Sequence, residues 1–291
     1  MSTDIQTLIS DIYSLVPTKG WLHDTDADAL SAAISARLQL QFTERTEKPT
    51  LRLSQMGPRC PCALWYSLHH PELAESLPPW AEIKFSYGHV LEALVITLAK
   101  AAGHKVEGEQ GHVELDNIVG HTDCIIDGCV VDVKSASSRS FIKFKDRSIV
   151  QNDPFGYLSQ LDGYVVGNRN NPLVTFKNTG YLLAVDKTLG HLCLYKHEVT
   201  NERERWLRDR IKAYKQIAAQ AQPPSCECIS IPHGTSGNLQ LDTKAGYSAY
   251  KYCCKPGLRT FIYANGPAYL TKVVRKPDVP EIDRYGNAVY N

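Results

Sequence analysis

The sequence predicts an α/β fold with a small mixed central sheet flanked by helices, N-terminal helices and an irregular C-terminal segment. Three observations support this class. Stretches with helical apolar spacing alternate with short apolar runs between residues 86 and 199, an order typical of α/β proteins. One apolar run contains the Asp127-Gly128 pair, a strong hairpin signal. The chain has 291 residues, of which 43% are hydrophobic and 22% charged, enough for a substantial core.

The N-terminal part is predicted to be helical from the spacing of its apolar residues. Helices are expected over residues 3–15, 26–38, 64–70 and 86–103. The last of these is apolar nearly all round, which indicates burial. Ser86 is expected as its N-cap, and Gly103 is expected just beyond its end.

The remainder mixes predicted strands with two helices. Strands are expected over 104–115, on both sides of Asp127-Gly128, at 141–145 and as a pair within 179–199, with helices at 154–167 and 201–222. Three regions follow: an N-terminal helical region (1–50), a core (51–222) and a C-terminal segment packing on that core (223–291).

The stretch GHTDCIIDGCVVDVKSAS, residues 120–137, places acidic residues in an otherwise apolar run. A two-residue type I′ turn at Asp127-Gly128 sets the strand register. Asp123 then lies opposite Asp132, and Lys134 shares their face because side chains alternate along a strand.

Two carboxylates directly across a sheet repel each other, and each also loses solvation among apolar neighbours. A divalent cation such as Mg²⁺ would remove both costs, and Lys134 would orient water or stabilise developing negative charge. The alternative is a simple Lys134 salt bridge to one acid, with the other solvated.

Glu92 offers a third ligand, because it lies among apolar residues of the predicted helix 86–103. Buried glutamates are almost always paired or bound. The alternative is a partnered surface glutamate. His89, one turn earlier, is a further ligand candidate, although a lone helix histidine is more often structural.

These residues resemble the PD-(D/E)xK nuclease superfamily, and most closely its RecB-like and Cas4-like branch, including Cas4-like exonucleases of tailed bacteriophages. The resemblance extends over roughly residues 50 to 275 and implies a restriction-endonuclease-like core. It rests on a helix glutamate, a G-x-x-D, a D-x-K and a Q-x-x-x-Y, here Glu92, Gly120 to Asp123, Asp132 to Lys134, and Gln160 with Tyr164.

The resemblance implies a role for each matching residue. Glu92, Asp123 and Asp132 would bind Mg²⁺ or Mn²⁺, with the Val133 carbonyl as an extra ligand. Lys134 would position the attacking water. Gln160 and Tyr164 would contact the DNA backbone or support the site.

The chain departs from Cas4-like relatives in its cysteines. Such relatives often hold a [4Fe–4S] cluster on one cysteine before the core and three after it. Here Cys60 or Cys62 would be the first and Cys254 the last, but Ala245 and Ser248 occupy expected cysteine positions. Four thiolates are the usual requirement, so an iron–sulfur cluster is not expected.

A zinc site completed by Cys226 and Cys228, with His233 nearby, is the alternative to an empty cysteine region. The C-x-C spacing is poor for tetrahedral ligation.

The net charge of +1, from 32 basic and 31 acidic residues, excludes a global positive field. Nucleic-acid binding must therefore rely on local clusters. Basic residues interleave with serines after Lys134, and Ser135, Arg139 and Lys143 are predicted phosphate contacts. The alternative is a solvated loop.

The leading interpretation is a Mg²⁺-dependent DNA exonuclease in phage replication, recombination or host-DNA degradation, acting on single strands or duplex ends. The alternatives are an endonuclease of the same fold, a catalytically silent DNA-binding or anti-defence protein, and a metal-buffering or scaffolding domain. No apolar run of about 18 residues or signal peptide is evident, so a cytoplasmic location is expected (host cytoplasm if phage-encoded). A homo-oligomer is left open.

Overall fold

The computed structural model describes residues 4–43 and 48–289, and the chain forms two compact units. The first contains the described residues up to Thr43, together with Arg52–Met56 and Pro78–Arg208. The second consists mainly of Gly57–Leu77 and the chain from Asp209 onward.

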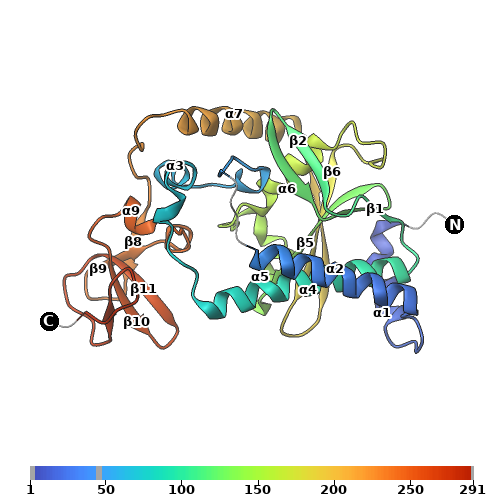
Figure 1. The fold of residues 1–291 in the computed structure, drawn as a ribbon, viewed down its shortest axis with the longest axis horizontal. Helices are drawn as coiled ribbons and strands as arrows, with labels where there is room; N and C mark the ends of the chain where they lie inside the picture. The colour runs from blue at the N-terminus through green and yellow to red at the C-terminus, as the bar shows by residue number, and fades with distance from the viewer. Residues whose placement is uncertain (1–3, 44–47, 290–291) are drawn as a thin grey trace. The chain divides into compact units, whose positions relative to one another are not determined.

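The first unit is built on a five-stranded mixed sheet with the order β1-β4-β5-β6-β7 (Figure 1). Its strands are β1 (Val106–Glu107), β4 (Cys124–Ile126), β5 (Cys129–Ala136), β6 (Thr179–Asp186) and β7 (Leu192–Glu198). β5 and β6 are parallel, and the other neighbours are antiparallel. A separate antiparallel pair joins β2 (Gly111–Leu115) to β3 (Ile118–Thr122). The predicted fold class, a mixed sheet flanked by helices, is confirmed.

The β4–β5 hairpin turns at the predicted dipeptide. Asp127 and Gly128 have φ values of 48° and 77°, as a type I′ turn requires. Ile126 pairs with Cys129, and Cys124 with Val131. The predicted register is therefore confirmed for these pairs.

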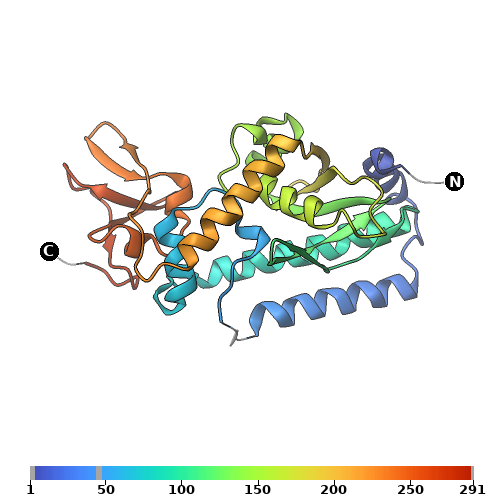
Figure 2. The same ribbon diagram turned by 90° about the horizontal axis from the view of Figure 1, so that it is seen from above.

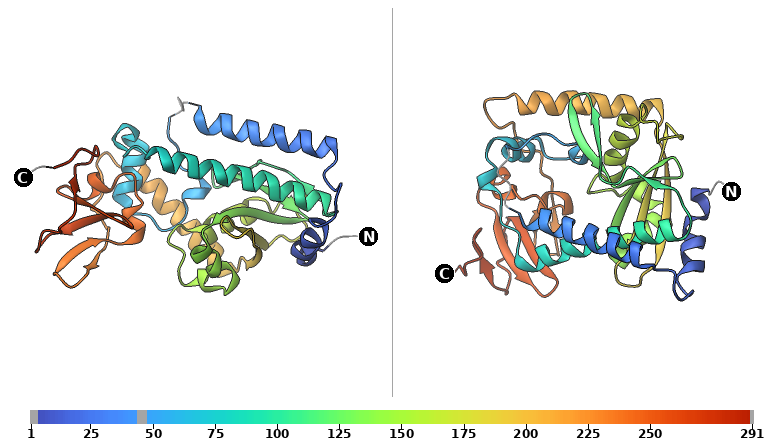
Figure 3. Two further views of the ribbon diagram at one scale, coloured as in Figure 1. Left: turned by 90° about the horizontal axis from the view of Figure 1, so that it is seen from below. Right: turned by 45° about the vertical axis from the view of Figure 1, so that its right-hand side comes forward.

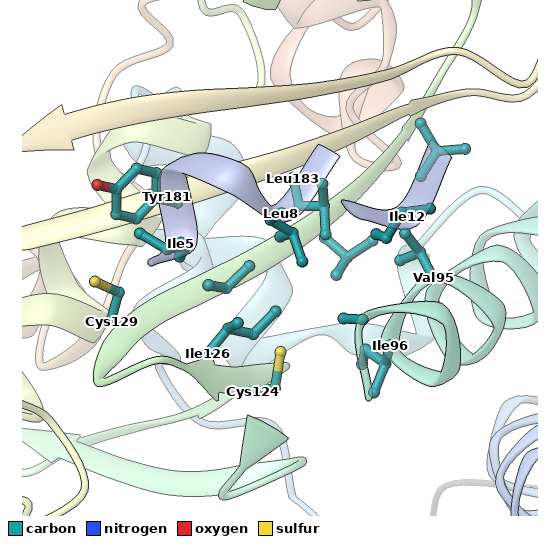
Figure 4. Packing of buried hydrophobic residues seen from close by; sticks show 14 residues of the cluster. Ile5, Leu8, Ile12, Val95, Ile96, Cys124, Ile126, Cys129, Tyr181 and Leu183 are labelled. Carbon is teal, nitrogen blue, oxygen red and sulfur yellow. The ribbon is translucent and has the colours of Figure 1, made fainter. Parts of the chain in front are cut away.

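Helices cover both faces of this sheet. Those in contact with its strands are α1 (Leu8–Leu15), α4 (Pro79–Ala101), α5 (Ser138–Lys145) and α6 (Tyr157–Gly167). The chain also forms α2 (Asp24–Phe42), α7 (Asn201–Ala218), which runs from the first unit into the second, and the 3-10 turns η1 (Ile5–Thr7), η2 (Leu53–Gln55) and η4 (Ser148–Val150). α1 and α4 bury apolar side chains against one face of β5 and β6 (Figure 4). α6 packs on the other face, where a Cβ on Gly180 would lie 2.6 Å from Val165.

Two predicted elements differ from the structure. α4 begins at Pro79, a residue suited to the first turn of a helix, so Ser86 lies inside the helix rather than capping it. The stretch 141–145 is helical, not a strand, because Phe141 and Phe144 are both buried at helical spacing and Ser137 caps the helix. Gly103 follows the end of α4 with a φ of 91°, as predicted.

α2 runs alongside α4 (Figures 2 and 3). Its 19 residues include none that is buried. Polar contacts therefore link it to α4, including the Gln41 amide, which donates to the Glu82 backbone carbonyl at 2.8 Å.

The C-terminal segment, expected to be irregular, forms a five-stranded antiparallel sheet with the order β12-β10-β11-β9-β8. The second unit contains α3 (Pro61–His69), η3 (Pro71–Leu73), β8 (Ser230–His233), β9 (Asn238–Leu241), α8 (Thr243–Gly246), α9 (Lys251–Cys254), β10 (Arg259–Tyr263), β11 (Gly266–Lys272) and β12 (Glu281–Ile282). Phe261, Ala268 and Leu270 are its buried apolar centre. None of the described helices is both long and apolar enough to cross a bilayer.

Candidate active site

Asp132 and Lys134 leave the same face of β5, as the two-residue period of a strand requires. Lys134 Nζ lies 2.6 Å from Asp132 Oδ2. The Asp132 side chain is 2% exposed and that of Lys134 is 16% exposed. A carboxyl group and an ammonium group are therefore held together in a largely water-excluded place.

Gln160 and Tyr164 of α6 complete this face. The Gln160 amide nitrogen donates to Asp132 Oδ1 at 3.3 Å and to the Tyr164 hydroxyl at 2.9 Å. Lys134 donates to Gln160 Oε1 at 3.3 Å. Residues four apart share a helix face, and the Q-x-x-x-Y spacing thus places Gln160 and Tyr164 on the face of α6 that meets the Asp132–Lys134 pair.

Asp123 directly precedes β4 and lies beside the same pair. Its Oδ2 accepts the backbone N–H of Val133 at 2.6 Å. The pairing of β4 with β5 ends at Cys124 and Val131, so the Asp123 carboxylate accepts a backbone N–H just beyond the end of the ladder. The structure thus brings together the predicted residues Asp123, Asp132 and Lys134.

Glu92 approaches from α4 and is held by two side chains that the sequence did not indicate. Its Oε1 accepts from Arg37 Nη2 at 2.9 Å and from the Gln110 amide at 2.8 Å. Arg37 is 55 positions away in the chain, and nothing in its local pattern predicted this contact. His89 is half-buried one turn before Glu92.

The three carboxylates are shifted toward the protonated form in the absence of a cation. Burial raises the pKa of Asp123 well above its usual range, and the neighbouring charges of Asp132 and Glu92 raise it further. Burial also raises the pKa of Asp132 and of Glu92, although Lys134 and Arg37 respectively oppose the change. Like charges and desolvation are the causes that the sequence anticipated.

Lys134 remains cationic. Burial by itself would lower the pKa of its ammonium group, but the carboxylates of Asp132 and Asp123 outweigh that effect and raise it. Lys134 therefore acts as a fixed positive charge and hydrogen-bond donor rather than as a neutral base.

The donor set fits a hard divalent cation. Asp132 Oδ2 is buried and ion-paired with Lys134, and it has no further hydrogen-bond partner among the described residues. It therefore has room for a cation as a second partner. Glu92 and Asp123 currently bond to other partners, so ligation by all three requires their carboxylates to turn toward the ion.

Gly120 explains the glycine of the G-x-x-D segment. A Cβ at this position would lie 2.8 Å from Tyr164 Cε1 and 3.0 Å from Leu53 Cβ. Only glycine therefore lets α6 and η2 pack this closely against β3.

The predicted DNA contacts lie on the end of β5 and on α5. Ser135 is half-buried, and its Oγ would lie 3.4 Å from a Cβ added at Gly88. Arg139 is exposed. Lys143 is half-buried and donates to the Asn152 carbonyl at 3.4 Å. They belong to a capped helix and a strand end rather than to a loop.

The second unit contains a separate cluster of thiols, the cysteine quartet of Cys60, Cys226, Cys228 and Cys254. Their sulfur atoms all lie within 4.8 Å of one another. Among the described residues, no other group of three or more potential metal-binding side chains is this close. The C-x-C spacing, expected to be unfavourable, thus brings both of its thiols to Cys60 and Cys254.

One thiol of the quartet is shifted toward the thiolate. Cys60 occupies the N-cap position of α3, where the helix dipole stabilises negative charge. Hydrogen bonds from Cys228 and Cys254 lower the pKa of Cys60, whereas the pKa values of the Cys228 and Cys254 thiols are raised. Cys62 is buried beside the quartet but is not a member, and the His233 ring instead contacts Gln240 and Tyr263. Four thiolates suit zinc or an iron–sulfur cluster.

No family model and no curated protein matches this chain. Solved structures with a related arrangement include the protein SSO0001, at 14% identity and a TM-score of 0.40, covering 80% of this chain and 97% of that one. An alkaline exonuclease from Laribacter hongkongensis has 13% identity and a TM-score of 0.33, with coverages of 73% and 86%. A phage-related exonuclease from Haemophilus somnus has 12% identity and a TM-score of 0.36, with coverages of 72% and 92%.

Proposed function

We propose that the protein is a metal-dependent nuclease that hydrolyses DNA phosphodiester bonds, and that it acts as an exonuclease. The observation that carries this proposal is the Asp132–Lys134 pair, with Gln160 bridging it and Asp123 beside it. The resemblance of these residues to the PD-(D/E)xK superfamily supports the same reaction. Their match to Cas4-like phage exonucleases supports a role in phage DNA replication or recombination, or in host DNA degradation.

Glu92, Asp123 and Asp132 would hold Mg²⁺ or Mn²⁺, with the Val133 carbonyl as a further ligand. When bound, the cation would polarise the phosphate and lower the pKa of an attacking water.

The protein's own side chains would orient the water, stabilise charge and bind the DNA. Lys134 is held charged beside Asp132, so its ammonium group can orient the attacking water and stabilise negative charge as it develops. Gln160 keeps Lys134 in position by accepting one of its hydrogens. Ser135, Arg139 and Lys143 would contact the DNA backbone.

The cysteine quartet would hold a soft metal centre that stabilises the second unit. The close approach of four sulfurs beside a helix N-terminus supports this proposal. Cys226 and Cys228 would then replace the two cysteine ligands that are expected at the positions of Ala245 and Ser248.

The test is a cleavage assay with Mg²⁺ or Mn²⁺ on linear single-stranded, linear duplex and covalently closed circular DNA. We expect loss of linear DNA only. Asp132→Asn should abolish it, and Lys134→Met should slow it about 100-fold or more. Nicking of circles would instead indicate an endonuclease, and intact DNA in every reaction would contradict the proposal.

Asp186→Asn is the matched control. Asp186 is another buried aspartate of this sheet, 1% exposed. Its Oδ1 accepts from Ser138, Thr188 and Leu189, and an asparagine oxygen can accept the same bonds. Its activity should therefore equal that of the wild type.

A further inference from the structure

Arg37 is the unusual residue of α2. The helix buries none of its residues, yet the Arg37 side chain is only 11% exposed. A guanidinium group loses solvation when it is buried and is normally fully paired. The position of Arg37 therefore needs an explanation beyond attachment of an exposed helix.

The hydrogen bonding of Arg37 is incomplete. Nη2 donates to Glu92 Oε1 at 2.9 Å, while Nε is buried without a hydrogen-bond partner among the described residues. Glu92 also accepts from Gln110. Arg37 thus presents a buried, unused donor within reach of a proposed metal ligand.

The charges of the site indicate what this donor would bind. When ionised, as metal ligands must be, Glu92, Asp123 and Asp132 carry three negative charges, while Lys134 and Arg37 carry two positive charges. A divalent cation would convert the excess of one negative charge into an excess of one positive charge. A single phosphate group would neutralise it, and guanidinium groups bind phosphate oxygens in a fork geometry.

We propose that Arg37 binds DNA, donating to a non-bridging phosphate oxygen of the strand at the site once a divalent cation engages Glu92. The inference rests on the proposed nuclease function and adds α2 to the DNA-binding surface. It assigns Arg37 a substrate-binding role, because its ion pair with Glu92 is exchanged for one with the DNA phosphate.

The test measures DNA binding by fluorescence anisotropy over a range of salt concentrations, with Ca²⁺ in place of Mg²⁺. Each phosphate contact contributes about 0.9 to the slope of log K against log salt on duplex DNA and about 0.7 on single strands. Arg37→Gln should reduce the slope by that amount. Arg37→Lys keeps the charge and should retain the wild-type slope.

Gln41→Ala is the matched control, because Gln41 also links α2 to α4 but contacts Glu82 rather than Glu92. It should leave the slope unchanged. If Arg37→Gln and Gln41→Ala only lower the melting temperature and neither changes the slope, Arg37 is a structural anchor and the inference is wrong. Cleavage of the same DNA by the wild type in a parallel reaction with Mg²⁺ separates that result from a failure of the nuclease proposal, in which the wild type would neither bind nor cut DNA.

Discussion

Lys134 Nζ lies 2.6 Å from Asp132 Oδ2, and Gln160 bonds to both partners from the facing helix. The bridge fixes the orientation of the Lys134 ammonium group and the Asp132 carboxylate, which in the proposed mechanism act on the same phosphate. Its loss should therefore reduce activity without removing either charge.

Gln160→Ala should lower kcat by about 10- to 100-fold, the usual effect of removing a residue that orients a metal ligand. KM for DNA should change much less, unless Gln160 also contacts the substrate. Steady-state kinetics on linear DNA measure both. Ser159→Ala, a buried change on the same helix, is the control, and equal kinetics for Gln160→Ala and wild type would contradict the role assigned to the bridge.

Metal binding should stabilise the protein more as pH rises. The pKa values of Asp123, Asp132 and Glu92 are raised in the folded state, so the folded state binds more protons than the unfolded one. These groups therefore favour folding below about pH 4, and their contribution is lost as pH rises through the folded pKa values. The increase in Tm caused by Mn²⁺ should be small at about pH 5 and larger at about pH 8.

Asp132→Asn provides the complementary measurement in EDTA. It removes one of the carboxyl groups whose pKa is raised, and it leaves the buried Lys134 ammonium group without its close counter-ion. In EDTA, the difference in Tm between Asp132→Asn and wild type should therefore become more favourable to the variant between about pH 5 and about pH 8. Mn²⁺ should no longer raise the Tm of the variant. A Mn²⁺ effect on wild type that is independent of pH would show that these carboxylates do not bind the ion.

Gly120→Ala should destabilise the first unit by about 1–3 kcal/mol, since its Cβ would overlap Tyr164 and Leu53. Displacement of Tyr164 should also lower activity through Gln160. Urea denaturation measures the stability. Gly88→Ala is the control, because its Cβ would make only an ordinary contact at 3.4 Å; similar unfolding curves for both variants would contradict the packing argument.

The cysteine quartet predicts a metal content that depends on four specific thiols. Cys226→Ser and Cys228→Ser should each reduce the metal bound per chain, measured by elemental analysis after anaerobic purification. Visible absorbance distinguishes an iron–sulfur cluster from colourless zinc. Cys253→Ser removes a thiol outside the quartet and should retain the metal, whereas a metal-free wild type would leave the thiols as simple packing residues.

Local rules predicted much of the central sheet but not all of the helices. The strands within 179–199 and the helix near 154–167 follow from short apolar patterns, and β6, β7 and α6 confirm them. The prediction of a strand at 141–145 is wrong because five residues are too few to distinguish the two-residue period of a strand from the period of a helix. Burial of Phe141 and Phe144 at helical spacing favours the helix. The C-terminal sheet was not predicted because its strands are short, and two of them, β8 and β11, contain proline.

The sequence by itself determined the centre of the candidate site. Asp127-Gly128 fixes the register of the hairpin, and the alternation of side chains then places Asp132 and Lys134 on one face. Tertiary structure decided that Arg37 reaches Glu92 across 55 positions and that Cys60 meets Cys226 across 166. Turn signals and hydrophobic periodicity depend on residues that are close in the sequence, whereas contacts between such distant residues depend on how whole helices and strands pack.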